Sequence, residues 1–110
     1  MPRRFDVVIS ADADGDLASI HDYLTVHASP AVAAAPVERM IEAAAVLETF
    51  PLRGPVPPEL EGLSHRGYRQ LSLRPYRLIY KVVDQAVVIV LIADGRRGLP
   101  ALLQRRLLSR

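Results

Sequence analysis

Cysteine and tryptophan are absent from this chain of 110 residues, and only 5% of its residues are aromatic. Without cysteine, neither a disulfide framework nor a thiolate site is possible. The longest unbroken apolar run, residues 86–93, is eight residues long, whereas a helix that crosses a bilayer needs about 20. Arg3 and Arg4 near the start are followed by Asp6 and only three apolar residues, which argues against an export signal. These absences predict a soluble, cytoplasmic protein without a membrane partner.

The length and the apolar content favour one folded domain over residues 1–110. A chain of this size has room for one domain and not for two. Half of its residues are apolar, which is too many for a disordered segment. Folding buries roughly 65% of the unfolded surface at this length, so one modest core can form without metals or crosslinks.

Negative charge is scarce in the second part of the chain. Residues 1–65 carry four basic and ten acidic side chains, whereas residues 66–110 carry ten basic side chains and only Asp84 and Asp94. Lys81 is the only lysine, and arginine offers planar donors that suit carboxylates and phosphates. A GC-biased genome explains part of the preference for arginine, but it does not explain the missing acids. The pattern predicts a polyanionic partner, either nucleic acid or an acidic protein segment.

Two helices are predicted between residues 10 and 47. Ser10 is a candidate N-cap, and the aspartates at positions 12, 14 and 16 place negative charge in the first turns, where the helix dipole favours it. The Ser-Pro pair at residues 29–30 is typical of the start of a second helix. Pro36 makes that helix either kinked early or regular only from about this residue. Apolar spacing predicts the buried stripes, which are Ala13, Leu17, Ile20, Leu24 and His27, and then Val37, Met40, Ile41, Ala44 and Leu47.

Four strands and a terminal helix complete the prediction. Residues 5–10 form a short β-branched run, and residues 68–73, 76–83 and 86–93 form a meander after a loop rich in proline and glycine. The last strand is the most apolar and is expected to be central. Residues 99–109 can form a short helix. This order predicts an α+β fold, with an N-terminal strand, a helical hairpin packed on a small, mostly antiparallel sheet, and a short C-terminal helix.

The arginines near the strands are the strongest candidates for a functional site. Arg69 and Arg77 each follow a tyrosine, and a turn at Arg74-Pro75 would bring several guanidinium groups onto one surface of the sheet. Arg96 and Arg97 follow the last strand and belong to the same set. The alternative is a charged sheet face that only keeps the protein soluble.

No catalytic or metal-binding constellation accompanies these arginines. His21 and His27 lie six residues apart, on different faces of the first helix, and nothing supplies a third metal ligand. Cleavage of RNA by its own 2′-hydroxyl needs a proton acceptor and a proton donor. The basic half offers Tyr68, Tyr76, Tyr80 and Asp94, with His65 at its margin, but at no spacing that indicates a site. No metal or cofactor is expected.

Six short motifs stand in a characteristic order along nearly the whole chain. They are Ala13-Asp14 with Asp16-Leu17, Ile20-His21-Asp22-Tyr23-Leu24, Phe50-Pro51-Leu52-Arg53-Gly54, Gly67-Tyr68-Arg69-Gln70-Leu71, Pro75-Tyr76-Arg77-Leu78-Ile79-Tyr80-Lys81-Val82 and Gly95-Arg96-Arg97-Gly98-Leu99-Pro100. In this order and spacing the chain resembles the ParE/RelE superfamily of toxins from bacterial type II toxin–antitoxin systems, and the ParE branch more closely. The last three motifs are the most specific. The resemblance implies the same fold, a helical hairpin packed on a small sheet.

The resemblance also implies how the protein acts and with which partners. A ParE-like toxin inhibits DNA gyrase by binding it, without chemistry of its own, and a ParD-like antitoxin neutralises the toxin. DNA is then contacted indirectly, through the antitoxin, and the terminal segment is tied to toxicity. The residues implied to bind the antitoxin or the target are Arg69, Arg74, Arg77, Arg96, Arg97, Leu103, Arg105 and Arg106.

Two alternatives stay open. A RelE-like toxin would cut messenger RNA on the ribosome, and Arg77 and Arg97 match basic residues of those enzymes. Against this, Asp94 stands where many relatives have histidine, and residues 102–108 contain no tyrosine or histidine. The other alternative is a toxin that has lost its toxicity and acts only in the antitoxin complex. In each case Asp94 can pair with Arg96 or Arg97 and so remove charge from the surface.

Overall fold

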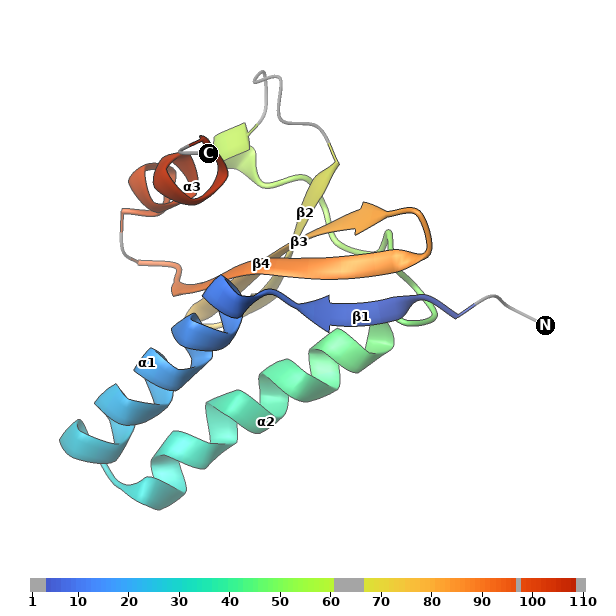
Figure 1. Ribbon diagram of the computed structural model, residues 1–110. Coiled ribbons are helices and arrows are strands. Elements are labelled where there is room, and N and C mark those ends of the chain that lie inside the picture. Colours follow the sequence, from blue (N-terminus) through green and yellow to red (C-terminus); the bar gives the residue numbers. More distant parts are fainter. Residues whose placement is uncertain (1–3, 61–66, 97, 109–110) are drawn as a thin grey trace.

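The computed structural model describes residues 4–60, 67–96 and 98–108. A four-stranded sheet has a helical hairpin on one face and a short helix on the other (Figure 1). The elements are β1 (Asp6–Ile9), α1 (Ala11–His27), α2 (Pro30–Val46), the 3-10 turn η1 (Pro58–Leu60), β2 (Tyr68–Leu73), β3 (Tyr76–Val83), β4 (Ala86–Asp94) and α3 (Leu99–Leu108). The predicted order of elements and the α+β class are confirmed.

The sheet is mixed, with strand order β1-β4-β3-β2. β1 runs parallel to β4, whereas β2, β3 and β4 form an antiparallel meander. β4 therefore lies inside the sheet, as its continuous apolar run predicts. β1 pairs only with the first half of β4, from Asp6↔Ala86 to Ile9↔Ile89, because the chain then turns into α1.

Both helices of the hairpin begin at the predicted serine caps. The hydroxyls of Ser10 and Ser29 each accept a hydrogen bond of 3.1 Å from the N–H three residues further along the chain. α2 is continuous from Pro30 to Val46 and contains Pro36. Of the two predicted alternatives for this helix, a start only near Pro36 is therefore wrong.

Two apolar clusters cover the two faces of the sheet. The buried residues beneath the hairpin are Ala13, Leu17, Met40, Ala44, Leu47, Leu78, Tyr80, Val87, Ile89 and Ile92. Those beneath α3 are Leu60, Ile79, Leu91, Ala93, Leu99 and Leu103. Neighbouring strand residues such as Leu78 and Ile79 belong to different clusters because side chains alternate between the faces of a strand.

Two members of the predicted helical stripes are exposed. Ile41 is 55% exposed, since Met40 faces the sheet and the next residue is turned about 100° away from it around the helix axis. His27 is exposed because the last turn of α1 extends beyond the sheet (Figure 1). Its ring stacks on Tyr23 with the centroids 4.2 Å apart.

Candidate functional site

The two strand arginines do not share one surface of the sheet. Arg69 pairs across the strands with Tyr80, whereas Arg77 pairs with Ser72. Positions 69 and 72 of β2 are an odd number of residues apart, so the two side chains leave opposite faces. Arg69 Nη1 donates to the carbonyls of Leu52 at 3.2 Å and Gly54 at 2.8 Å. The expected convergence of these guanidinium groups is therefore wrong.

Arg77 lies on the α3 face in a cluster with Glu59 and Gln70, which we call the Arg77 cluster. Its Nη2 donates to Glu59 Oε1 at 2.8 Å, and its Nε donates to Gln70 Oε1 at 2.8 Å. A second bond joins Nη1 to Glu59 Oε2, so the carboxylate is held by both arms of the guanidinium. The side chains are only 16% and 19% exposed for Arg77 and Glu59. The guanidinium is thus occupied by groups of the same chain.

The hydrogen bonds from Arg77 lower the pKa of Glu59 below its usual value of 4.5, against the opposing effect of burial. A lowered folded-state pKa means that this carboxylate stabilises the fold fully above about pH 4.5. Its contribution is lost as the pH falls through the lower folded-state pKa. Protonation of Glu59 in acid should therefore weaken the Arg77 cluster and lower the stability of the protein.

Glu59→Gln should remove this part of the pH dependence. We expect the variant to be less stable than the wild type at pH 7, and the difference to shrink as the pH falls below about 4.5. Urea unfolding at a series of pH values measures it. As a control, Glu42→Gln on the exposed side of α2 should change the unfolding free energy at pH 7 by less than about 0.5 kcal/mol. A Glu59→Gln deficit that stays the same at every pH would contradict the linkage.

Arg96 pairs with Asp94 at the end of β4, as the sequence allowed. Arg96 Nη2 and Nε donate to the two carboxylate oxygens at 2.7 and 3.0 Å, and the Arg96 N–H donates to one of them at 2.9 Å. The pKa of the nearby Tyr76 is raised, mainly by burial and to a smaller extent by the charge of Asp94. The Arg96 side chain is 78% exposed, so part of its charge is offset while it remains accessible. Arg97 and His65 lie outside the described residues.

The remaining candidates differ in their surroundings. Arg74 is exposed in the turn between β2 and β3, and its carbonyl accepts a hydrogen bond from Arg39 at 3.3 Å. Arg105 is exposed on α3. Leu103 is only 2% exposed and belongs to the cluster beneath α3, so it holds α3 in place and offers no surface to a partner.

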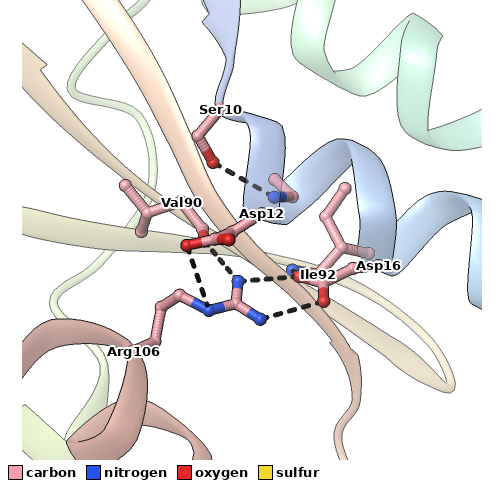
Figure 2. A network of polar contacts seen from close by, with 7 residues as sticks. Ser10, Asp12, Asp16, Val90, Ile92 and Arg106 are labelled. Atoms are coloured by element: carbon pink, nitrogen blue, oxygen red, sulfur yellow. Dashed lines mark hydrogen bonds and ion pairs between the residues drawn. The ribbon is translucent and has the colours of Figure 1, made fainter. Parts of the chain in front are cut away.

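Arg106 binds α1 and β4 instead of pointing into solvent (Figure 2). Its Nη1 and Nη2 donate to the two carboxylate oxygens of Asp16, each at 3.0 Å, and Nη1 also donates to the Val90 carbonyl at 2.7 Å. Asp16 in turn accepts a hydrogen bond of 2.9 Å from the Ile92 N–H. Asp12 lies further out, 3.8 Å from Arg106 Nε. Hydrogen bonding to Asp16 raises the pKa of Arg106.

This network was not predicted from the sequence. Asp16 was expected to interact with the helix dipole, and Arg106 to belong to the surface that binds the antitoxin or the target. One signal was available, because Asp16 stands beside Leu17 within the buried stripe of α1, where a carboxylate needs a partner. The identity of that partner was not accessible, because Arg106 is 90 residues away along the chain.

A groove of about 560 Å³ lies between α1, the end of β4 and α3. Apolar side chains from all three elements and the rings of Tyr23 and Tyr76 line it. Two ion pairs, Asp16–Arg106 and Asp94–Arg96, also lie in its wall. Its lining residues are Asp16, Ser19, Ile20, Tyr23, Leu24, Tyr76, Leu91, Ile92, Ala93, Asp94, Arg96, Leu102 and Arg106. Such a surface suits an apolar segment of another protein better than a phosphate.

Within the described ranges, no group of three or more acidic or histidine side chains is placed to hold a metal ion. Of the helices in the same part of the chain, none is long and apolar enough to cross a membrane.

The family model of the ParE toxin of the type II toxin–antitoxin system parDE matches residues 7–99. The chain belongs to the ParE toxin family. The predicted kinship with the ParE branch, and a role as the toxin of a type II system, are thereby confirmed. None of the curated proteins compared with this ParE-family chain matches it.

Two solved structures have a similar fold. The chromosomal ParDE system from P. aeruginosa matches with a TM-score of 0.70 at 22% identity, over 84% of this chain and 97% of that chain. The toxin–antitoxin complex RelBE2 from Mycobacterium tuberculosis matches with a TM-score of 0.55 at 26% identity, over 83% of this chain and 91% of that chain. The ParE-type structure is the better match in shape, although the RelE-type one is also recognisable.

Proposed function

We propose that this ParE-family protein inhibits DNA gyrase in the cytoplasm by binding to it, without chemistry of its own. The observation that carries the proposal is the Arg77 cluster. A nuclease of the RelE type needs cationic side chains that face a phosphate, and Arg77 is the strand arginine that matches them. Here both arms of its guanidinium are bound by Glu59, and Gln70 occupies its Nε.

Two of the three candidate tyrosines also favour binding over catalysis, whereas the third, Tyr68, lies on the α3 face of the sheet together with Arg77. Tyr76 and Tyr80 belong to the hairpin face of the sheet, opposite to Arg77. The Tyr80 hydroxyl accepts a hydrogen bond from the Gly54 N–H at 3.0 Å, and burial raises the pKa of Tyr80. A proton carrier for attack by a 2′-hydroxyl must reach the reacting atoms, and these two side chains are on the wrong side of the sheet.

A ParD-like antitoxin is the proposed second partner. The solved ParDE and RelBE2 structures are toxin–antitoxin systems by their descriptions. The groove between α1, β4 and α3 is a concave surface suited to such a partner, and Tyr23, which lines it, is 62% exposed. The arginines that remain exposed, Arg74, Arg96 and Arg105, can add contacts to acidic residues. Contact with DNA would pass through the antitoxin.

The gyrase proposal is tested with the purified, antitoxin-free protein, gyrase and supercoiled plasmid. We expect linear plasmid to accumulate as trapped cleaved DNA, and addition of the antitoxin to prevent it. Because the Arg77 cluster is internal, Gln70→Ala should retain this activity within about threefold as long as the protein is folded. Circular dichroism serves as the control for folding.

The alternative functions give different results in the same set of assays. A RelE-like endoribonuclease, which the weaker match to RelBE2 favours, would leave the plasmid intact and cut messenger RNA in a translating ribosome preparation. A toxin that has lost its toxicity would bind the antitoxin but leave plasmid, messenger RNA and bacterial growth unaffected. Either result with folded protein in large excess would overturn the gyrase proposal.

A further inference from the structure

Along the edge of β4 where β1 pairs with its first half, the second half of β4 has no neighbouring strand among the described residues. Pairing between β1 and β4 ends at Ile9↔Ile89, and in the described part of the chain the edge from Val90 to Asp94 continues without a strand next to it. Residues 91 and 93 of β4 face β3, as the hydrogen bond from Gly95 to Pro75 in the same register indicates. Residue 92 therefore turns its backbone groups outward. An open edge of this kind invites pairing with another chain.

The side chains of Asp16 and Arg106 occupy this edge (Figure 2). Asp16 accepts the hydrogen bond of the Ile92 N–H, and Arg106 donates to the Val90 carbonyl. These are the acceptor and the donor that a neighbouring strand would supply. Two further hydrogen bonds of 3.0 Å join the two side chains to each other. With 18% and 21% of their side chains exposed, Asp16 and Arg106 are largely withdrawn from water, where such bonds are stronger than at an open surface.

The same pair connects the terminal helix to α1 and β4. α3 touches the sheet through Leu99 and Leu103, which are both 2% exposed. Arg106 follows Leu103 by three residues and so extends the same side of the helix by one turn. Apolar contacts alone permit a helix to slide and rotate, because they are not directional. The hydrogen bonds of Arg106 to two other elements fix its orientation.

We propose that Arg106 is a positioning residue, which together with Asp16 holds α3 in one orientation and closes the edge of β4. The family resemblance implied that Arg106 binds the antitoxin or the target, whereas its guanidinium is directed into the protein. The adjacent Arg105 is exposed, and its position depends on the orientation of α3. That the orientation of α3 matters for toxicity rests on the proposed function. The positioning of α3 by Arg106 does not.

The test compares Asp16→Asn with Asp12→Asn. Asp16→Asn keeps a side-chain oxygen for the Ile92 N–H and removes the charge that binds Arg106, whereas Asp12 is 55% exposed and lies 3.8 Å from Arg106. Amide hydrogen exchange is measured by NMR. We expect the amides of α3 to exchange roughly tenfold faster in Asp16→Asn, and less than about twofold faster in Asp12→Asn. Equal exchange in the two variants would overturn the proposal.

Arg106→Lys separates the bridging geometry from charge alone. Lysine keeps the charge but has a single ammonium group, which cannot reproduce the planar fork between Val90 and both oxygens of Asp16. We therefore expect faster exchange of α3, as in Asp16→Asn, and in addition a changed Ile92 amide shift. Exchange at the wild-type rate would show that a positive charge suffices and would overturn the positioning role.

The plasmid assay then distinguishes the two proposals. If the wild type traps gyrase and Asp16→Asn traps it less well while still folded, the positioning of α3 contributes to toxicity. If trapping is unchanged although α3 exchanges faster, the role in toxicity is wrong and the gyrase proposal stands. If the wild type does not trap gyrase, the gyrase proposal fails, and the exchange data alone decide whether Arg106 positions α3.

Discussion

Gly54→Ala is expected to destabilise this protein strongly. A Cβ atom at this position would lie 2.2 Å from the Gln70 carbonyl oxygen and 3.0 Å from the Tyr80 hydroxyl. The first of these is backbone within β2, so it cannot move aside as a flexible side chain would. The Gln70 N–H also donates to the Pro55 carbonyl at 2.9 Å, which ties the segment that follows Gly54 to β2.

The clash would also break a buried hydrogen bond. The Gly54 N–H donates to the Tyr80 hydroxyl at 3.0 Å, and Tyr80 is fully buried. Overpacking costs about 1–3 kcal/mol, and a buried polar group that loses its partner costs about 1–3 kcal/mol more. A small domain has only about 5–15 kcal/mol of stability in total. Thermal unfolding followed by circular dichroism should show a Tm lower by more than about 10 °C, or no folded protein.

Gly15→Ala is the matched control. Gly15 lies within α1, and an added Cβ would meet nothing within 4 Å. The same chemical change should therefore stabilise the protein by about 1 kcal/mol, since alanine is the better helix former. If Gly54→Ala unfolds within a few degrees of the wild type, the close approach of residue 54 to β2 is wrong.

Leu103→Ala is the second substitution with a large expected effect. Leu103 is 2% exposed and packs in the cluster beneath α3 with Ile79, Leu91 and Leu99. Removal of a buried leucine side chain costs about 2–5 kcal/mol, depending on how far the neighbours close the cavity. We expect urea unfolding to show a loss in this range, and α3 to be released from the sheet before the rest of the protein unfolds.

A functional assay of Leu103→Ala needs a second variant for comparison, so that a loss of stability can be separated from a loss of contact with a partner. Leu102 adjoins Leu103 but is only half-buried and lines the groove. Leu102→Ala should cost about 1 kcal/mol and act mainly on binding by the groove. A loss of toxicity in Leu103→Ala alone would reflect displacement of α3. A stability of Leu103→Ala within about 1 kcal/mol of the wild type would contradict the burial of this residue.

The case of Leu103 illustrates a general limit on predicting the site from the sequence. Leucines recur every four residues at positions 99, 103 and 107, which is typical of one side of a helix. This spacing does not tell whether that side faces a core or a partner. Leu99 and Leu103 face the core. The same spacing serves both purposes, since both remove apolar surface from water.

The arginines show where strand patterns lose information. Each strand and the turn between β2 and β3 were predicted correctly. The face on which Arg69 and Arg77 emerge depends on the register across the turn, and a shift of one residue reverses it. The observed register separates the two side chains and leaves Arg77 beside Glu59, a residue of the proline-rich loop whose position had no local signal.

Patterns along the chain were enough to predict the elements, their order, the two serine caps, the central place of β4 and membership of the ParE family. These depend on spacings within a few residues or on motifs in a fixed order, and both can be read along the chain. The two long-range ion pairs were evident only in the folded protein: they join Arg77 to Glu59 over 18 residues and Arg106 to Asp16 over 90 residues. Such pairs form because packing of the sheet, the hairpin and α3 brings distant groups together out of water, and no local pattern encodes that approach.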